Sequence, residues 1–256
     1  MPDQINDLVA VGVGNSRLRF GRFEGPSLHA PRSMAIADLA EAARAIADLA
    51  QAGTPVVVAS VNDAAAATLE QVLGDLRVRL YRIGRDLAID LRHTVDDIKG
   101  VGQDRLLCAI GAFQQARQAC VVVDAGTAVT VDFIDGEGVF HGGAIAPGAS
   151  MMLSALHERT AGLPEVEFAS LDEGASAFGR NTRDAMLLGV HGAIVGLVHH
   201  LVERYATFYD AYPQIVATGG DAPALFENDP IIEHIVPDLQ LVGIHTACAR
   251  ALADDD

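Results

Sequence analysis

Two glycine-containing turns carry residue types that can bind phosphate. They are GVGNS (12–16) and the start of DAGTAVT (124–130). Each follows an apolar run and precedes an alternating run, which predicts a strand, a tight turn and a returning strand. Backbone N–H groups at such a turn can donate to phosphate oxygens, because glycine lets the backbone come close. The second copy opens with Asp124, whereas Gly12 stands at the equivalent position of the first, so only one turn carries a carboxylate.

A third segment, VGQDR (101–105), places a carboxylate beside a guanidinium. An alcohol that attacks a phosphoryl group must lose its proton, and an aspartate within hydrogen-bond reach can accept it. Asp104 is therefore a candidate general base, and Arg105 can bind an acidic substrate or support Asp104. The alternative is that the pair only begins a helix, since acidic side chains favour helix N-termini. Because the other motifs occur in the same chain, we favour the interpretation of Asp104 as a general base.

The elements that must position these residues follow from the apolar pattern, which repeats along the chain. The expected strands are 7–14, 17–23, 55–61, 78–83, 119–124, 128–134, one near 138–141, and one running from 214 into the glycine turn of 218–222. The expected helices are about 35–51, 64–73, 103–118, 183–209 and 239–252, with 142–148 as a loop. This order predicts an α/β protein built twice, with halves 1–118 and 119–256.

Composition excludes several classes of function. The 256 residues include 34 acidic and 18 basic side chains, for a net charge of −16, which is unsuited to nucleic-acid binding. The cysteines are far apart and lie in apolar runs, so we expect buried thiols in a reducing compartment rather than disulfides or zinc; they are Cys108, Cys120 and Cys248. The N-terminus lacks the pattern of a signal peptide, and the sequence shows no clear apolar run of membrane-spanning length, so we expect a cytoplasmic protein without a membrane partner.

Six motifs occur in a fixed order: GVGNS (12–16), VGQDR (101–105), DAGTAVT (124–130), HGGAIAPG (141–148), GRNT (179–182) and TGGDA (218–222). In this set, and in ALHERTAGLPEVE (155–167), the chain resembles the type III pantothenate kinases of the acetate and sugar kinase/Hsp70/actin superfamily over nearly its full length. The resemblance implies duplicated actin-like (ribonuclease H-like) domains with an active-site cleft between them. It also implies ATP with Mg²⁺, pantothenate as acceptor in the first step of coenzyme A biosynthesis, and a homodimer.

The resemblance also implies a role for individual residues. Asp104 would be the catalytic base, and Asp124 would help to hold a monovalent cation, K⁺ or NH₄⁺. The implied ATP-binding residues are Gly12, Val13, Gly14, Asn15, Ser16, Arg17, Leu18, Arg19, Thr127, Gly219 and Gly220. The implied substrate-binding residues are Gly102, Gln103, Asp104, Arg105 and Thr182. Thr182 would touch substrate across the dimer interface; it can also be the N-cap of the long helix, and both can hold.

The first motif departs from the family, which has DVGNT where this chain has GVGNS. The family's aspartate lies beside the transferred phosphate and magnesium, and Asp7, about 16 Å away along an extended strand, cannot replace it. One hypothesis is an active kinase with a rearranged metal shell; the other is a catalytically impaired relative that binds nucleotide or regulates. The retained Asp104, Arg105, Asp124, Thr127 and Thr182 favour the first. A dimerisation module, the third class, would not need phosphate-binding turns.

Overall fold

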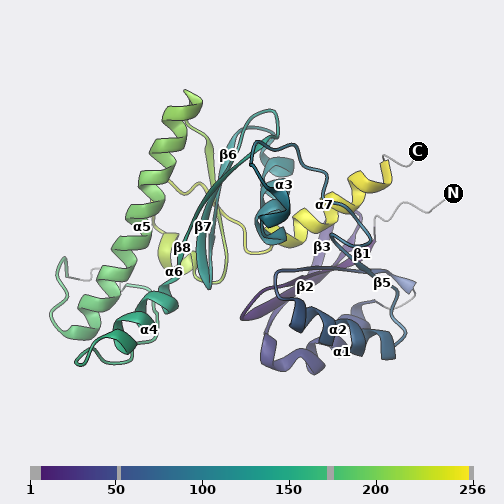
Figure 1. The fold of residues 1–256 in the computed structure, drawn as a ribbon, viewed down its shortest axis with the longest axis horizontal. Helices are drawn as coiled ribbons and strands as arrows, with labels where there is room; N and C mark the ends of the chain where they lie inside the picture. The colour runs from purple at the N-terminus through teal and green to yellow at the C-terminus, as the bar shows by residue number, and fades with distance from the viewer. Residues whose placement is uncertain (1–6, 51–52, 172–175, 254–256) are drawn as a thin grey trace. The chain divides into compact units, whose positions relative to one another are not determined.

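The computed structural model describes residues 7–50, 53–171 and 176–253, which form two compact units. One unit comprises Met1–Arg117, Gly138–Phe140 and Asp238–Asp256, and the other comprises Gln118–Glu137 and His141–Pro237. Each contains its own five-stranded sheet (Figure 1). We describe the two units in turn.

The first unit contains a mixed sheet in the order β3-β2-β1-β4-β5. Strands β1 to β3 form an antiparallel meander, whereas β4 and β5 run parallel to β1. Their bounds are Leu8–Val13, Arg17–Glu24, Ser27–Ala35, Val56–Ser60 and Leu80–Arg82. The three parallel strands therefore end at one edge of the sheet, where α/β proteins commonly bind ligands.

Helices cover both faces of this sheet because its central strands are apolar on both sides. Val11 and Val13 pack with α1 (Leu39–Leu49) and α2 (Asp63–Asp75). Leu8 and Ala10, which point the other way, pack with α3 (Gln103–Ala116) and α7 (Leu239–Ala253). Since side chains alternate along a strand, Gly12 lies on the α3 and α7 face.

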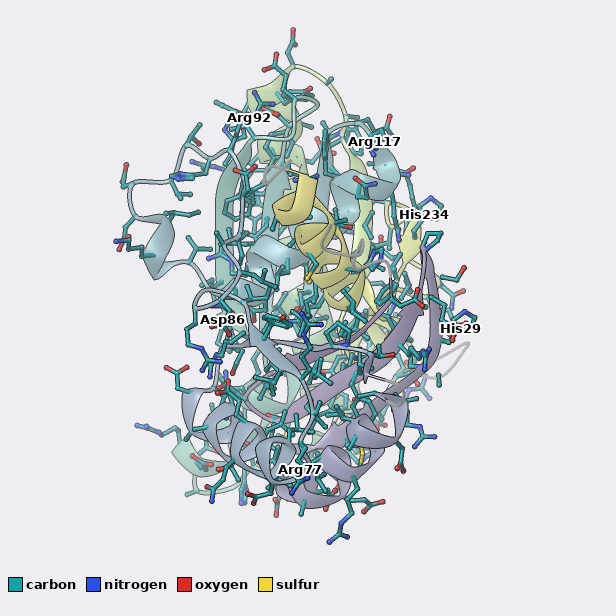
Figure 2. The ribbon with its side chains drawn as sticks, turned by 90° about the vertical axis from the view of Figure 1, so that its right-hand side faces the viewer. His29, Arg77, Asp86, Arg92, Arg117 and His234 are labelled. Carbon is teal, nitrogen blue, oxygen red and sulfur yellow. The ribbon has the colours of Figure 1, made fainter. Side chains whose placement is uncertain are left out.

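Local signals explain where two of these helices begin and end. Asn62 accepts a hydrogen bond from the Ala65 amide (3.1 Å) and caps α2, as its sequence position predicts. Helix α3 ends at Ala116, and its C-cap Arg117, labelled in Figure 2, adopts a left-handed conformation (φ 52°). Its amide bonds to the Phe113 carbonyl (2.9 Å), the closing contact typical of helix C-termini.

The second unit repeats this topology with the sheet order β10-β9-β6-β7-β8. Strand β6 pairs with β7 antiparallel and with β9 parallel, and β9 pairs with β10 parallel. The strands are Cys120–Ala125, Ala128–Ile134, Phe140–Pro147, Gln214–Thr218 and His234–Ile235, and the helices are α4 (Ala149–Arg159), α5 (Thr182–Tyr209) and α6 (Ala222–Phe226). The strand β6, the equivalent of β1, thus ends beside β9, the equivalent of β4.

The predicted α/β class and its duplication are confirmed: each half runs through three strands and then alternates helices with strands. The two units differ from the expected halves 1–118 and 119–256 at Gly138–Phe140 and at α7, which both belong to the first unit. That helix, which closes the second half of the sequence, packs against α3, which closes the first (Figure 1). The last helix of both halves of the sequence therefore belongs to the first unit.

Three expectations need correction. The segment 142–148 is not a loop, because β8 continues through it to Pro147. Strands β3 and β10 were not predicted; β3 is largely exposed and β10 has two residues, so neither shows a clear apolar pattern. Finally, one described helix, α5, is long and apolar enough to cross a membrane, with a hydropathy of 1.7. Core helices pass the same test, and α5 buries Met186, Val190, Ile194 and Val198 in its unit's core.

Candidate active site

The first glycine turn lies at the carboxyl edge of the first sheet. The Gly14 amide donates to the Arg17 carbonyl (2.9 Å), which closes the turn, and the Val61 amide donates to the Val13 carbonyl (3.1 Å). Asn15 and Ser16 are exposed at its tip. Val13 and its neighbour across the ladder, Leu18, are fully buried, so they support the turn from the core.

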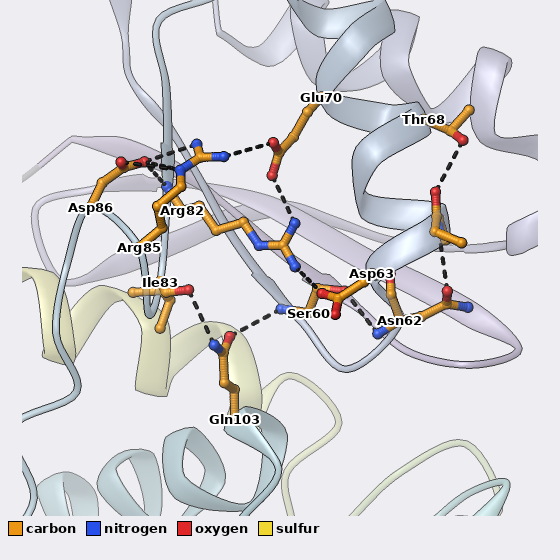
Figure 3. Close-up of polar contacts among 12 residues, drawn as sticks. Ser60, Asn62, Asp63, Thr68, Glu70, Arg82, Ile83, Arg85, Asp86 and Gln103 are labelled. Carbon is orange, nitrogen blue, oxygen red and sulfur yellow. Dashed lines mark hydrogen bonds and ion pairs between the residues drawn. The ribbon is translucent and has the colours of Figure 1, made fainter. Parts of the chain in front are cut away.

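The start of α3 is fixed to the same edge by Gln103. Its Oε1 accepts from the Ser60 amide (3.3 Å) and its Nε2 donates to the Ile83 carbonyl (3.1 Å), as Figure 3 shows. Ser60 ends β4 and Ile83 follows β5, so one amide bridges the ends of both parallel strands. Gln103 therefore serves first to position α3, and any contact with substrate would come in addition.

Asp104 follows directly in the first turn of α3. Burial raises the pKa of its carboxyl above the usual aspartate range, although the Arg105 amide donates to Oδ1 (2.8 Å) and opposes that shift. A β-carbon added to Gly102 would lie 2.5 Å from Oδ1 and 3.6 Å from Val61, so the glycine leaves room for the carboxylate. A largely buried aspartate with a raised pKa suits proton abstraction.

Beside this helix start, Figure 3 shows a network of ion pairs that joins α2 to β5. Arg82 pairs with Asp63 (2.6 Å) and Glu70 (3.0 Å), and Arg85 pairs with Glu70 (3.0 Å) and Asp86 (3.0 Å). These guanidinium groups are already matched by carboxylates. We therefore assign the network to holding the loop after β5 rather than to ligand binding.

Gly12 is bordered by groups that the sequence patterns did not single out. It pairs with Arg19 in the β1–β2 ladder, and Arg19 forms an ion pair with Asp238 (2.9 Å), just before α7. A β-carbon added to Gly12 would meet the side-chain amide of Gln240, with Cδ at 2.7 Å and Nε2 at 3.2 Å. The space beside Gly12 is thus filled from α7. Arg17, by contrast, hydrogen bonds to Ser33 on β3 (2.9 Å).

The second glycine turn is built in the same way in the second unit. The Gly126 amide donates to the Ala128 carbonyl (3.0 Å), which closes the turn, and Thr127 is exposed at its tip. The Thr127 carbonyl accepts from the Gly148 amide (3.1 Å). The Pro-Gly step after β8 therefore supports this turn, a contact that the sequence motifs did not reveal.

Asp124 lies at the carboxyl edge of the second sheet, opposite Thr218 of β9. Gly219 follows with a left-handed φ of 96°, and a β-carbon there would lie 2.5 Å from Asp124 Oδ1. Two residues after Gly219, the Asp221 amide donates to the Ala125 carbonyl (3.0 Å). Burial raises the pKa of the Asp221 carboxyl. Gly220 has open space around it. Only glycine fits at position 219, whereas position 220 is free of steric demand.

The donor atoms at this edge decide which cations would fit. A carboxylate and backbone carbonyls are hard oxygen ligands of the kind that alkali and alkaline-earth cations take. Among the residues that the structure describes, no group of three or more His, Cys, Asp or Glu side chains could hold a metal. Asp124 therefore fits the monovalent cation implied by the resemblance, whereas a zinc-type centre has no donor set in the described ranges.

Thr182 is the first residue of α5, and it is not the N-cap. Asn181 takes that place, because its Oδ1 accepts from the Asp184 amide (2.9 Å). The capping interpretation of Thr182 is therefore wrong by one residue. Its side chain is exposed, which leaves it open to a ligand or partner.

The arrangement of the two sheets identifies the fold class of the protein. Paired five-stranded sheets of this order form an actin-like fold. A Baf family transcriptional activator structure from Campylobacter jejuni is similar with a TM-score of 0.60 at 22% identity, covering 96% of this chain and 100% of that one. An activator of 2-hydroxyisocaproyl-CoA dehydratase from Clostridium difficile, with bound ADPNP, gives 0.52 at 14% identity, covering 97% and 95%.

Sequence relatives define the family within that class. Residues 8–204 match the family described as Type III pantothenate kinase. The type III pantothenate kinase of Dehalococcoides mccartyi is 34% identical over 93% of this chain and 95% of its own length. That of Rubrobacter xylanophilus is 31% identical over 94% and 97%. The chain belongs to the type III pantothenate kinase family.

Proposed function

We propose that the protein transfers the γ-phosphoryl group of ATP to the primary hydroxyl of pantothenate. The products are 4'-phosphopantothenate and ADP, and the reaction is the first step of coenzyme A biosynthesis. The observation that carries the proposal is the position of Asp104, a largely buried carboxylate at a helix start on the same sheet edge as the first glycine turn. Full-length similarity to named pantothenate kinases supports it.

Asp104 would act as the general base. The hydroxyl oxygen attacks the γ-phosphorus, its proton passes to the Asp104 carboxylate, and the bond to the leaving ADP oxygen breaks. The burial that raises the pKa of this carboxyl also makes it a better proton acceptor than an exposed aspartate. Arg105, the next residue, supplies a cation that can pair with the pantothenate carboxylate.

The two glycine turns would bind the phosphates. Exposed amides and hydroxyls at Asn15, Ser16 and Thr127 are suitable donors, and Gly219 and Gly220 would adjoin the nucleoside. Mg²⁺ would take most of its ligands from the substrate phosphates and water. When bound, Mg²⁺ and the monovalent cation at Asp124 offset the negative charge of the reacting phosphates.

The family's homodimer and cytoplasmic location are part of this proposal. In support of a dimer, α5 leaves Gly189, Gly192 and Gly196 facing open space, and Phe178, before its N-terminus, is 77% exposed. Thr182, exposed between these groups, would then meet the acceptor site of the partner subunit. Sedimentation at micromolar concentration tests this expectation.

A second candidate function, nucleotide binding without catalysis, is suggested by Gly12, which lacks the carboxylate of the family's first motif. The chain would then bind nucleotide without transferring phosphate, as a regulatory relative. The intact set of Asp104, Asp124 and Thr127, each placed at a sheet edge, favours the active enzyme.

Purified protein incubated with ATP, Mg²⁺, K⁺ and pantothenate tests the proposal. We expect 4'-phosphopantothenate to form in equal amount to ADP, detected by mass spectrometry, and to require K⁺ or NH₄⁺. The Asp104→Asn variant is the control for contaminating kinase. If the wild-type protein binds ADP in calorimetry but forms no product above this control, the regulatory function replaces the proposed one.

A further inference from the structure

The amide of Gln240 occupies the space where a side chain at position 12 would begin. Gly12 lies on the face of the first sheet that α3 and α7 cover, and Gln240 is in the first turn of α7. A β-carbon added to Gly12 would approach the amide oxygen most closely, with Cδ at 2.7 Å and Nε2 at 3.2 Å. The two positions are mutually exclusive unless the glutamine swings away.

The structure fixes Gln240 on both sides. Leu239 and Leu241 are fully buried. Two residues earlier, Asp238 pairs with Arg19, and their side chains are only 22% and 28% exposed. Gln240 itself is partly buried. The packing of α7 and the ion pair therefore hold the backbone at Gln240 in place, and its partly buried side chain lies beside Gly12.

An amide and a carboxylate act differently beside phosphate. A carboxylate only accepts hydrogen bonds and repels phosphate, so it contributes through a cation. An amide is neutral and has two N–H donors and one acceptor, and a half-turn about its last bond can present either end. Around Gly12, Arg19 and Asp238 cancel each other in charge, and Gln240 adds none. The first turn thus carries no net negative charge from these residues.

We propose that Gln240 is a phosphate-binding residue that takes the place of the carboxylate missing at Gly12. It donates directly to the nucleotide, so nucleotide binding depends less on Mg²⁺ than it would with a carboxylate in that space. This inference rests on the proposed function, because it assumes that the first glycine turn binds the phosphates of a nucleotide.

Calorimetry with ADP, once in Mg²⁺ and once in EDTA, tests the inference. The quantity to compare is the dissociation constant in EDTA divided by the dissociation constant in Mg²⁺. Gln240→Glu puts a carboxylate in the same space, and we expect it to raise that ratio about tenfold, mainly by weakening binding in EDTA. Gly12→Asp combined with Gln240→Ala returns the carboxylate from β1 and is expected to raise the ratio similarly. Gln240→Ala alone should weaken ADP binding about fivefold in both conditions, since it removes a donor.

The matched control is Gln71→Glu, an identical change of charge at an exposed position of α2, on the opposite face of the same sheet. It should leave both dissociation constants unchanged. If Gln240→Glu behaves like this control while the wild-type protein binds ADP and makes product, the inference is wrong and the proposed function stands. If the wild-type protein binds no ADP in either condition, both are wrong.

A comparison of melting temperatures checks the shared space without any ligand. Gly12→Asp should lower the melting temperature when Gln240 is present and lower it less in the Gln240→Ala background, because the amide is no longer displaced. Equal shifts in the two backgrounds would show that the amide does not occupy the space beside Gly12, and would overturn the proposal.

Discussion

The two glycine turns of this protein use the same topology and opposite arrangements of their side chains. In the second unit, Asp124 on the central strand supplies the oxygen, and Gly219 on the neighbouring connection makes room for it. In the first unit, the central strand carries Gly12, and the side-chain amide of Gln240 from α7 lies beside it. At each sheet edge, one polar side chain lies beside one glycine. In the second unit the polar side chain is on the central strand, whereas in the first unit the glycine is on the central strand.

This comparison changes how the missing carboxylate is interpreted. In the sequence, Gly12 looks like the simple loss of a charge at the reacting centre. In the structure, a glycine at position 12 is what allows an amide from α7 to reach the turn. We interpret the first motif as altered rather than emptied, with the second turn as the internal reference that shows the arrangement with its carboxylate retained.

The largest effect is expected at Asp104, the proposed general base, which lies outside both turns. Asp104→Asn removes the proton acceptor, and we expect kcat to fall about 10³-fold, in the range typical of a lost general base. ADP binding should hardly change, because the substitution leaves both turns intact. If kcat falls by less than tenfold, another residue is the base, and the position of Asp104 beside the first turn no longer supports a role in catalysis.

The same carboxyl sets the expected pH dependence. Burial raises its pKa, and the base acts only when deprotonated, so kcat/KM should fall as the pH drops through that raised value. The acid limb should therefore lie above the ordinary aspartate range. A rate profile measured from pH 4 to pH 9, against buffers of constant ionic strength, shows its position. A kcat/KM that does not fall as the pH is lowered to 4 would contradict the assignment of Asp104.

The sequence alone was sufficient to predict structural elements whose signals lie close together in the chain. The alternating runs on both sides of 12–16 and 124–130 predicted the two hairpins, and Asn62 predicted the start of α2. The pattern of VGQDR placed Asp104 at a helix start, as found. These features depend on residues that are neighbours in the chain, so their spacing carries the information.

The sequence was insufficient where the deciding contact is distant along the chain. Gln240 reaches Gly12 only because α7 packs with the first unit, and no spacing rule links the two positions. The support of Thr127 by Gly148 requires β8 to continue through glycines that resemble a loop. At α5, Asn181 and Thr182 are both good capping residues, and only the hydrogen bond to Asp184 distinguishes them.

The next largest effect sharpens the comparison from the side of the second unit. Asp124→Asn converts its turn to the neutral, amide-bearing state that we infer for the first. We expect kcat/KM for ATP to fall about a hundredfold, as for other lost electrostatic groups, and the stimulation by K⁺ to disappear. Activity measured against increasing K⁺ separates the two effects. Full activity with normal K⁺ stimulation would show that the carboxylate of this turn has no part in cation binding.

The smallest effects are in stability and compare the two glycines directly. Gly219→Ala forces a side chain into a left-handed backbone and against Asp124, so it should cost about 1–3 kcal/mol of unfolding free energy. Gly12→Ala meets only the movable end of Gln240 and should cost under about 1 kcal/mol. Gly220→Ala, in open space, is the control. Urea unfolding followed by circular dichroism measures all three. Equal losses at positions 12 and 219 would mean that Gln240 is held as rigidly as backbone, because its amide could then not yield to a single added methyl group.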